Sequence, residues 1–372
     1  MKKVLKQCVG IDCAKDELAV CFGQLSEAMD ISHKATAVFT NTLGGFKKLA
    51  SWAQKLADSE VPVCFVIEAT GVYHQKITSY LFDAGNPISV VLPNKASHFA
   101  KTLKVRTVND KESSKMLATL GLEKQLDAWQ KPEAIFTHLK QLTRERERLI
   151  NEITVCKNQL HAEEHGAYGL PSTVKRIKKL IAFMDKQVRQ IAQEITLLIE
   201  SHAELDEKIK KACTIPGIGL ITAVTIVAEC NGFNLIRNSK QLVSYAGYDV
   251  VEKQSGTSVL GKAHISGHGN KHIRKVLHFP AITHVKYDIH HQNLYTRLES
   301  KHGIKMKAYT AIQRKLLVLI YTLWKKNESY RPMYHNEKPS SPKNLEQPLK
   351  VALTGLDLVR PHDIDISVCK DK

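Results

Sequence analysis

The chain has 372 residues, 43% of them hydrophobic, which is enough for two or three domains with their own cores. Its 54 Lys and Arg residues outnumber its 37 Asp and Glu residues, giving a formal net charge of +17. Such an excess favours a polyanionic partner, most simply nucleic acid. No apolar run reaches the ~18 residues of a membrane span, and MKKVLKQCVG lacks the apolar region of a signal peptide. We therefore expect no membrane association and a cytoplasmic protein, which in a bacterium would meet the nucleoid.

The eight cysteines contain no CxxC pair, and several lie in apolar runs. They are expected to be small core side chains in a reducing compartment rather than zinc ligands or disulfides. The histidines spaced by four between His264 and His272 are interrupted by glycines, so this spacing does not predict a metal site.

Residues 1–125 alternate between strand and helix patterns. Strands are predicted at QCVGID, ELAVCF, ATAVFTN, VPVCFVIEAT and PISVVLP, and helices at GGFKKLASWAQKLA, YHQKITSYLFDAG, NKASHFAKTL and DKESSKMLATLGL. The order β-β-β-α-β-α-β-α is that of an α/β domain of the ribonuclease H-like type.

Residues 130–210 carry two heptad stripes, from Ile135 to Leu160 and from Val174 to Ile209, with Arg146 and His202 as polar breaks at core positions. HGAYGLPS separates the stripes. The pattern predicts a long antiparallel helical coiled-coil hairpin of about 45–55 Å at ~1.5 Å per residue. A solitary hairpin would expose apolar seams, so we expect a second copy of the chain to pack on it, as a dimer or tetramer. The alternative is packing against the chain's own domains.

Residues 211–325 are expected to form a mostly helical C-terminal domain. It opens with IPGIGLITA, in which Gly217 and Gly219 fit either a turn whose backbone N–H groups grip a DNA phosphate or a tight turn between helices. From Arg237 to Arg331 there are 17 Lys and Arg against 5 Asp and Glu. Residues 326–372, rich in Pro, Lys and Ser, are predicted to be a flexible tail.

Three acidic residues end or begin predicted elements of the α/β domain. Asp12 and Glu68 each end an apolar strand, and Asp110 opens a helix. Acids at the ends of buried strands are costly unless they bind a cation, and carboxylate oxygens are the ligands that Mg²⁺ or Mn²⁺ prefers. Together they fit a two-metal site for phosphoryl transfer. Singly, Asp12 could start a turn and Asp110 could cap its helix.

Ser255 lies in QSGTSVLG, within the most basic part of the chain. The glycine after it permits close approach to a phosphate, and a serine suggests covalent phosphoryl chemistry. The alternative is an ordinary serine in a solvated loop. The expected nucleic-acid-binding cations are its neighbours in sequence, Lys253, Lys262, Lys271, Arg274 and Lys275.

Five segments in this order resemble one protein family over nearly the whole chain: VGIDCAKDELAV, VIEATGVYH, the Asp110 helix ending in MLA, IPGIGLITA, and QSG followed by GNKHIRK. The chain is similar to insertion-sequence transposases with a DEDD acid set, a RuvC-like N-terminal domain and a serine-bearing C-terminal transposase domain. The resemblance implies that Asp12, Glu68 and Asp110 bind Mg²⁺ and that Ser255 attacks DNA to give a phosphoserine link. It also implies a noncoding bridge RNA that pairs with donor and target DNA.

The fourth acid of that family does not match. Counting back from Ala118, it falls on Ser113, and Glu112 lies one residue away. Either Glu112 supplies the oxygen, or the site uses three acids with Ser113 or water. Because residues three apart share a helix face, Ser113 rather than Glu112 is expected on the side of Asp110.

The sequence therefore predicts a DNA transposase or recombinase acting on element ends and target DNA. One alternative is a junction nuclease that uses only the N-terminal acids, which leaves Ser255 without a role. The other is a noncatalytic nucleic-acid-binding relative, which the missing fourth acid would suit.

Overall fold

The computed structural model describes residues 3–69, 71–103, 109–234, 236–252, 254–255, 259–261 and 263–332, with only the backbone of 254–255 and 259–260. The predicted tail therefore lies almost wholly outside the described residues. Within them, no helix is both long and apolar enough to cross a membrane.

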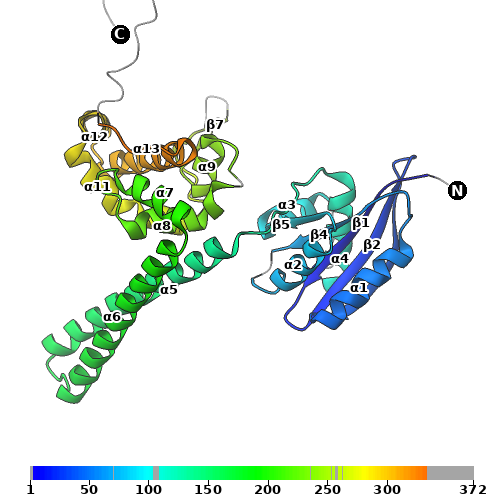
Figure 1. Cartoon of the computed structure of the whole chain (residues 1–372), viewed down its shortest axis with the longest axis horizontal. Coiled ribbons are helices and arrows are strands. Elements are labelled where there is room, and N and C mark those ends of the chain that lie inside the picture. Colours follow the sequence, from blue (N-terminus) through cyan, green and yellow to red (C-terminus); the bar gives the residue numbers. More distant parts are fainter. Residues whose placement is uncertain are drawn as a thin grey trace, which may run out of the picture. The chain divides into compact units, whose positions relative to one another are not determined.

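A five-stranded sheet forms the centre of the N-terminal part, in the order β3-β2-β1-β4-β5 (Figure 1). Its strands are β1 (Val4–Cys13), β2 (Glu17–Ser26), β3 (Ile31–Thr40), β4 (Val63–Glu68) and β5 (Ile88–Val91). The first three pair antiparallel, whereas β4 lies parallel to both β1 and β5. All five predicted strands are confirmed.

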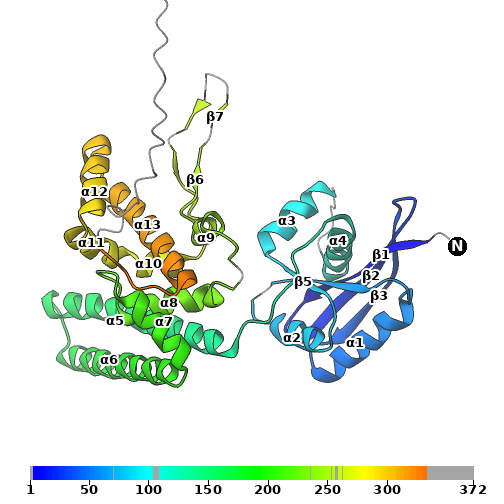
Figure 2. The ribbon, with the colours of Figure 1, turned by 45° about the horizontal axis from the view of Figure 1, so that its top comes forward.

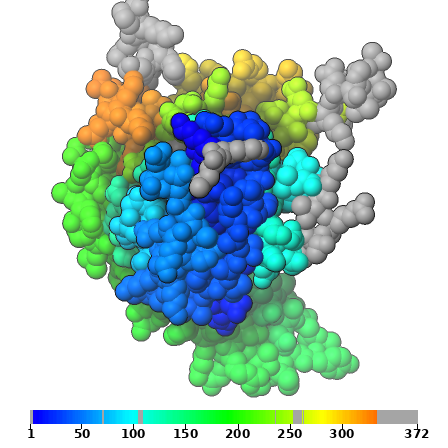
Figure 3. All heavy atoms as spheres, turned by 90° about the vertical axis from the view of Figure 1, so that its right-hand side faces the viewer, coloured from blue at the N-terminus to red at the C-terminus, as the bar shows by residue number. Residues whose placement is uncertain are grey.

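Both faces of the sheet are covered by helices. On one face, α1 (Leu43–Leu56) and α2 (Gln75–Asp83) bury Leu49 and Leu81 against Ile11 and Ile67. On the other, α3 (Pro93–Thr102) and α4 (Asp110–Glu123) pack over Cys8 and Val66. The residues of β1 to β3 and α1, in blue in Figure 3, present a continuous surface.

Two glycines let α4 lie very close to the sheet. A Cβ on Gly10 would stand 2.2 Å from the Ser114 carbonyl oxygen, and a Cβ on Gly121 would stand 2.3 Å from Cys8 Sγ. Gly10 precedes Asp12 by two positions, so both face the same side of β1. The helix is thus held at the face on which Asp12 lies.

Two long helices, α5 (Ala134–His165) and α6 (Pro171–Glu200), run beside each other as a hairpin (Figures 1 and 2). Leu149, Ile153, Met184 and Ile191 are buried in the seam between them. Helix α5 has 32 residues, so at ~1.5 Å per residue it is about 48 Å long. The prediction of one continuous second helix is wrong, because the chain breaks at Ser201 and continues as α7 (Ala203–Cys213).

The break also corrects the role expected of His202. It is exposed, precedes α7 as its N-terminal boundary residue, and places Nδ1 3.1 Å from the Leu198 carbonyl oxygen. It is therefore no core position. Arg146 does remain half-buried in the first helix, and burial lowers the pKa of its guanidinium.

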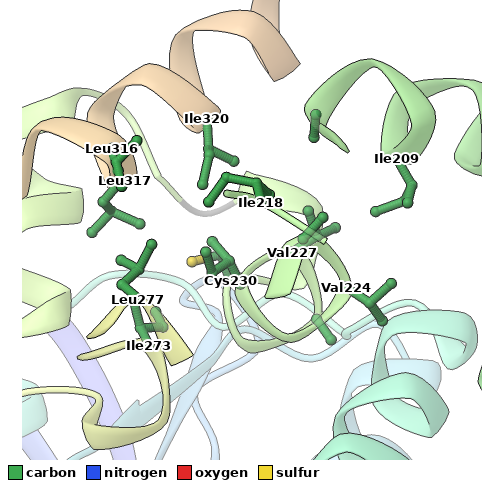
Figure 4. Close-up of a cluster of buried hydrophobic side chains, with 14 of the residues drawn as sticks. Ile209, Ile218, Val224, Val227, Cys230, Ile273, Leu277, Leu316, Leu317 and Ile320 are labelled. Carbon is green, nitrogen blue, oxygen red and sulfur yellow. The ribbon is translucent and has the colours of Figure 1, made fainter. Parts of the chain in front are cut away.

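The rest of the described chain is mostly helical, as predicted. Its helices are α8 (Leu220–Glu229), a short 3-10 turn (Asn231–Phe233), α9 (Ser239–Ala246), α10 (Lys271–Val276), α11 (His278–Tyr287), α12 (Ile289–His302) and α13 (Lys305–Lys326). They share one hydrophobic cluster with α5 to α7. Figure 4 shows Val224 and Val227 of α8 lying among Ile209 of α7, Ile320 of α13 and Leu277, which lies between α10 and α11.

A hairpin interrupts this helical part between α9 and α10. The short strands β6 (Val250–Val251) and β9 (His264–Ile265) pair antiparallel, and so do β7 (Gln254–Ser255) and β8 (Val259–Leu260). In Figure 2, β6 and β7 extend away from the helices. The sequence did not predict these strands.

Candidate active site

The pairing register brings Asp12 and Glu68 together. Strands β1 and β4 run parallel with Ile11 beside Ile67, so the next residue on each strand is one of these acids. Both side chains are half-buried at the carboxyl ends of their strands. Burial, followed by the charge of Asp12, raises the pKa of Glu68.

Helix α4 brings the third acid, Asp110, to the same place. Asn109 begins the helix, and its side-chain oxygen accepts a hydrogen bond from the Glu112 N–H at 2.9 Å. Asn109 is thus the cap, and Asp110 is left free for another role in the first turn. Burial and then the charge of Asp110 raise the pKa of Asp12. We call Asp12, Glu68 and Asp110 the acid cluster.

Ser113 and Glu112 lie in different surroundings. The Ser113 side chain hydrogen-bonds to Asp12, an interaction that lowers the pKa of that carboxyl against the two opposing effects. Glu112 instead accepts a hydrogen bond from Lys115 Nζ at 2.7 Å. This lysine lowers the pKa of Glu112. The residue beside the acid cluster is therefore Ser113.

An open cleft of about 760 Å³ reaches Asp12 and Asp110. Its lining also includes Asn109, Tyr73 and two exposed lysines, Lys15 and Lys111. These lysines could bind a phosphate backbone near the acids. Sequence analysis did not single them out, although Lys15 follows Asp12 by three positions and Lys111 directly follows Asp110.

The acid cluster fits divalent cations. Its donors are carboxylate oxygens, and two of them have pKa values raised partly by a neighbouring carboxylate. A cation would offset that repulsion while accepting oxygen ligands. The other group that the sequence suggested, Glu112, points to Lys115 and does not join this set.

Ser255 lies on the hairpin, where its backbone pairs with Val259 across β7 and β8. The Ser255 side chain and the residues Lys253 and Lys262 lie outside the described part of the chain. The structure places Ser255 in a short strand rather than in a loop without regular structure.

The three basic residues of α10 differ in exposure and contacts. Lys271 is exposed. Arg274 donates to the Ala246 carbonyl oxygen at 2.7 Å. Lys275 Nζ lies 3.0 Å from a Glu147 oxygen on α5. Arg274 and Lys275 therefore connect parts of the fold, which sequence reasoning could not anticipate because their partners are distant along the chain.

Gly217 and Gly219 also differ. Gly217 has φ +89°, and a Cβ there would lie 2.8 Å from the Pro280 carbonyl oxygen. A tight turn against α11 therefore accounts for this glycine. Gly219 is exposed with open space around it and begins α8. Of the two glycines, Gly219 is the exposed one, and phosphate binding by its backbone stays a prediction.

Comparison with known proteins gives two family matches. Residues 9–163 match a model described as a transposase, and residues 210–296 match one described as the transposase IS116/IS110/IS902 family. Together these segments cover more than half of the chain.

Curated relatives match over most of their length. A pilin gene-inverting protein of Moraxella bovis is 28% identical, covering 89% of this chain and 99% of that protein. A transposase for insertion sequence element IS1111A of Coxiella burnetii is 22% identical, covering 87% of this chain and 91% of that protein.

Among solved structures, T. thermophilus RuvC in complex with a Holliday junction substrate is similar at 11% identity and a TM-score of 0.24. The similarity covers 30% of this chain and 90% of that chain. The two family matches and the near full-length relatives lead to one conclusion: the chain belongs to the IS110-type family of insertion-sequence transposases with a DEDD acid set.

Proposed function

We propose that this protein cuts and rejoins DNA, with the acid cluster holding divalent cations and Ser255 as the nucleophile. Its family consists of enzymes that act on DNA, and its net charge of +17 suits that substrate. The observation that carries the proposal is that two strands and a helix bring Glu68 and Asp110 close to Asp12, beside a cleft lined by Asp12 and Asp110.

The cations, Mg²⁺ or Mn²⁺, would supply charge stabilisation for oxygens around a phosphorus undergoing substitution. Asp12, Glu68 and Asp110 would hold them, with the Ser113 hydroxyl in the place of the family's fourth acid. Lys15 and Lys111 would position the DNA backbone along the cleft. Free cysteines at all seven described cysteine positions suit the reducing cytoplasm, where DNA is also found.

In the proposed covalent step, Ser255 Oγ bonds to the scissile phosphorus as the phosphorus–oxygen bond to one deoxyribose breaks. The serine proton passes to a base or solvent, and the departing oxygen takes up a proton. Rejoining reverses the step, because a hydroxyl of another strand attacks the phosphoserine. The number of phosphodiester bonds is conserved, so no external energy source is needed.

The proposed assembly contains a noncoding guide RNA and more than one copy of the chain. The basic stretch from Arg237 to Arg331 supports a second polyanion beside DNA. Exposed apolar side chains on α6 support a second copy as their partner: Phe183 is 61% exposed and Leu197 is 66% exposed. These two are 14 residues apart, two heptads, and so lie on one side of the helix.

Strand exchange between a plasmid carrying the element ends and a target plasmid tests the function. Wild type with the RNA transcribed from the flanking DNA should yield joined products. Asp12→Asn, Glu68→Gln and Asp110→Asn should each lower the yield at least about 100-fold, as loss of a cation ligand predicts. Robust exchange by all three variants, or in excess EDTA, would refute the cation-dependent reaction, and exchange that survives RNase treatment would refute the guide RNA.

A further inference from the structure

Three side chains of metal-ligand type meet at the corner between α11 and α12. His284 comes from α11, Asp288 lies between the helices, and His291 comes from the first turn of α12. One ligand atom from each lies within 4.8 Å of the other two. His284 is fully buried, and the others are mostly buried.

The hydrogen bond of His284 to the backbone determines which ring nitrogen is available to bind a metal. His284 Nδ1 lies 2.8 Å from the Pro216 carbonyl oxygen, so its N–H donates there. In the neutral ring, Nε2 then carries a lone pair. This lone pair faces the corner, because Nε2 lies 3.1 Å from His291 Nδ1 and 3.7 Å from Asp288 Oδ2. Metal-bound histidines commonly have this backbone anchor.

One proton between His284, Asp288 and His291 cannot give every acceptor there a hydrogen bond. His291 Nδ1 lies 3.0 Å from Asp288 Oδ1 as well as 3.1 Å from His284 Nε2. One N–H on His291 therefore faces two acceptors. A cation bound in place of that proton would accept the lone pairs of both histidines and a carboxylate oxygen. Ligands bonded at about 2.0–2.1 Å in a tetrahedron lie about 3.3 Å apart, close to the separations present.

The carboxylate is oriented by further donors. The Tyr330 hydroxyl donates to Asp288 Oδ2, and the His291 backbone N–H donates to Oδ1 at 2.8 Å. An ionised carboxylate and a neutral imidazole are the ligand forms that bind metal ions.

We propose that His284, Asp288 and His291 bind one divalent transition-metal ion of the zinc class. Two imidazoles and one carboxylate suit zinc rather than Mg²⁺, which prefers oxygen ligands. The proposed site contains two histidines, whereas the acid cluster contains carboxylates alone. It would tie the α11–α12 corner to the turn at Pro216 and to Tyr330, close to the end of the described chain. Its role would be to fix these three segments.

Zinc binding by the full-length protein tests the proposal. Protein freed of transition metals and kept in excess Mg²⁺ is titrated with Zn²⁺ by calorimetry, and with Co²⁺ while its visible absorption is recorded. Wild type should bind one more Zn²⁺ per chain than His291→Ala or Asp288→Asn, and its Co²⁺ spectrum should show low coordination number. His302→Ala, an exposed histidine of the same helix, is the matched control and should bind as wild type does. Zn²⁺ at about 100 times its Kd should raise the Tm of wild type by about 5–10 °C.

The outcome is independent of DNA cutting, because Asp12→Asn should lose strand exchange and retain the zinc equivalent. Circular dichroism checks that the variants fold, and His291→Gln replaces His291→Ala if the latter does not. Equal zinc stoichiometry in wild type and folded variants would overturn the site. So would wild type that binds no Zn²⁺ under these conditions, a result that requires no variant.

Discussion

At the scale of single residues, Ser113 stands at the position where the fourth acid of the family is expected. Its side chain hydrogen-bonds to Asp12, whereas the adjacent Glu112 is paired with Lys115. Ser113→Asp adds a carboxylate beside the acid cluster. We expect the Kd for Mn²⁺ to fall about tenfold, which corresponds to about 1.4 kcal/mol, with strand exchange retained.

Glu112→Gln is the matched control for that variant, since it removes a carboxylate that lies one residue away. It should change the Mn²⁺ affinity and the exchange rate by less than about threefold, because Glu112 faces Lys115 rather than the acid cluster and a partly exposed ion pair contributes little. If Glu112→Gln abolishes exchange as Asp110→Asn does, Glu112 is the fourth acid.

The acid cluster should make the cation-free fold depend on pH. The pKa values of Asp12 and Glu68 are raised in the fold, so the folded chain binds these protons more tightly than the unfolded chain does. Their ionisation therefore destabilises the fold as pH rises through the raised values. Asp12→Asn should increase the free energy of unfolding of cation-free protein at pH 7 by on the order of 1 kcal/mol. Chemical denaturation in EDTA should show this gain shrinking toward pH 4, and a loss of stability at pH 7 would contradict the electrostatic account.

At the scale of elements, hydrophobic periodicity predicted the sheet, its helices and the long hairpin because each buries a repeating apolar face. Contacts distant in sequence could not be predicted. The period of the second heptad stripe continues across Ser201, so nothing in the apolar spacing marked the end of α6. Similarly, QSG gave no strand signal, because β7 and β8 are two residues long. Of the site, strand-end acids were visible in the sequence, whereas Lys15 and Lys111 became candidates only through their shared cleft.

An ion pair between an exposed arginine and a buried glutamate connects the hairpin with the helices after it. Glu229 of α8 is fully buried, and its two oxygens accept from Arg144 of α5 at 2.6 and 2.9 Å. Arg144→Met would leave that carboxylate with only Asn270 and Lys140 as partners and should cost about 2 kcal/mol of unfolding free energy. Arg148→Met removes an exposed pair with Glu152 and should cost less than about 1 kcal/mol. If urea denaturation gives both variants the same loss of unfolding free energy, the contact with Glu229 stabilises the fold no more than an exposed ion pair does.

Substitutions on the two sides of the α5–α6 hairpin should have different effects, on folding in the seam and on assembly at the outer side of α6. Leu149 and Ile191 are buried in the seam within one chain, so Asp at either position should cost several kcal/mol and unfold the hairpin. Phe183 is exposed on the outer side of α6, so Phe183→Asp should leave the fold intact and lower the oligomer mass in light scattering. Lys186→Asp, on an exposed polar position, serves as control. An unchanged mass for Phe183→Asp would exclude this side as the contact between copies.

At the scale of the whole molecule, the excess of basic residues, the acid cluster and the proposed nucleophile Ser255 together support one enzyme that cuts and rejoins DNA. The acid cluster lies in the N-terminal α/β part, and Ser255 lies on a hairpin within the helical part. The alternatives weighed for the sequence use only part of this equipment. A junction nuclease needs no serine, and a noncatalytic relative needs neither acids nor serine.

The most direct test is to identify the amino acid that becomes linked to DNA. The protein is incubated with Mn²⁺, RNA and a nicked element-end substrate that traps the covalent intermediate, digested, and analysed by mass spectrometry. The account predicts a phosphate-linked nucleotide on the peptide containing Ser255. It also predicts no adduct for Ser255→Ala, whose DNA affinity should stay within about threefold because only a hydroxyl is removed. Attachment to another residue, or strand exchange by Ser255→Ala at the wild-type rate, would contradict the account.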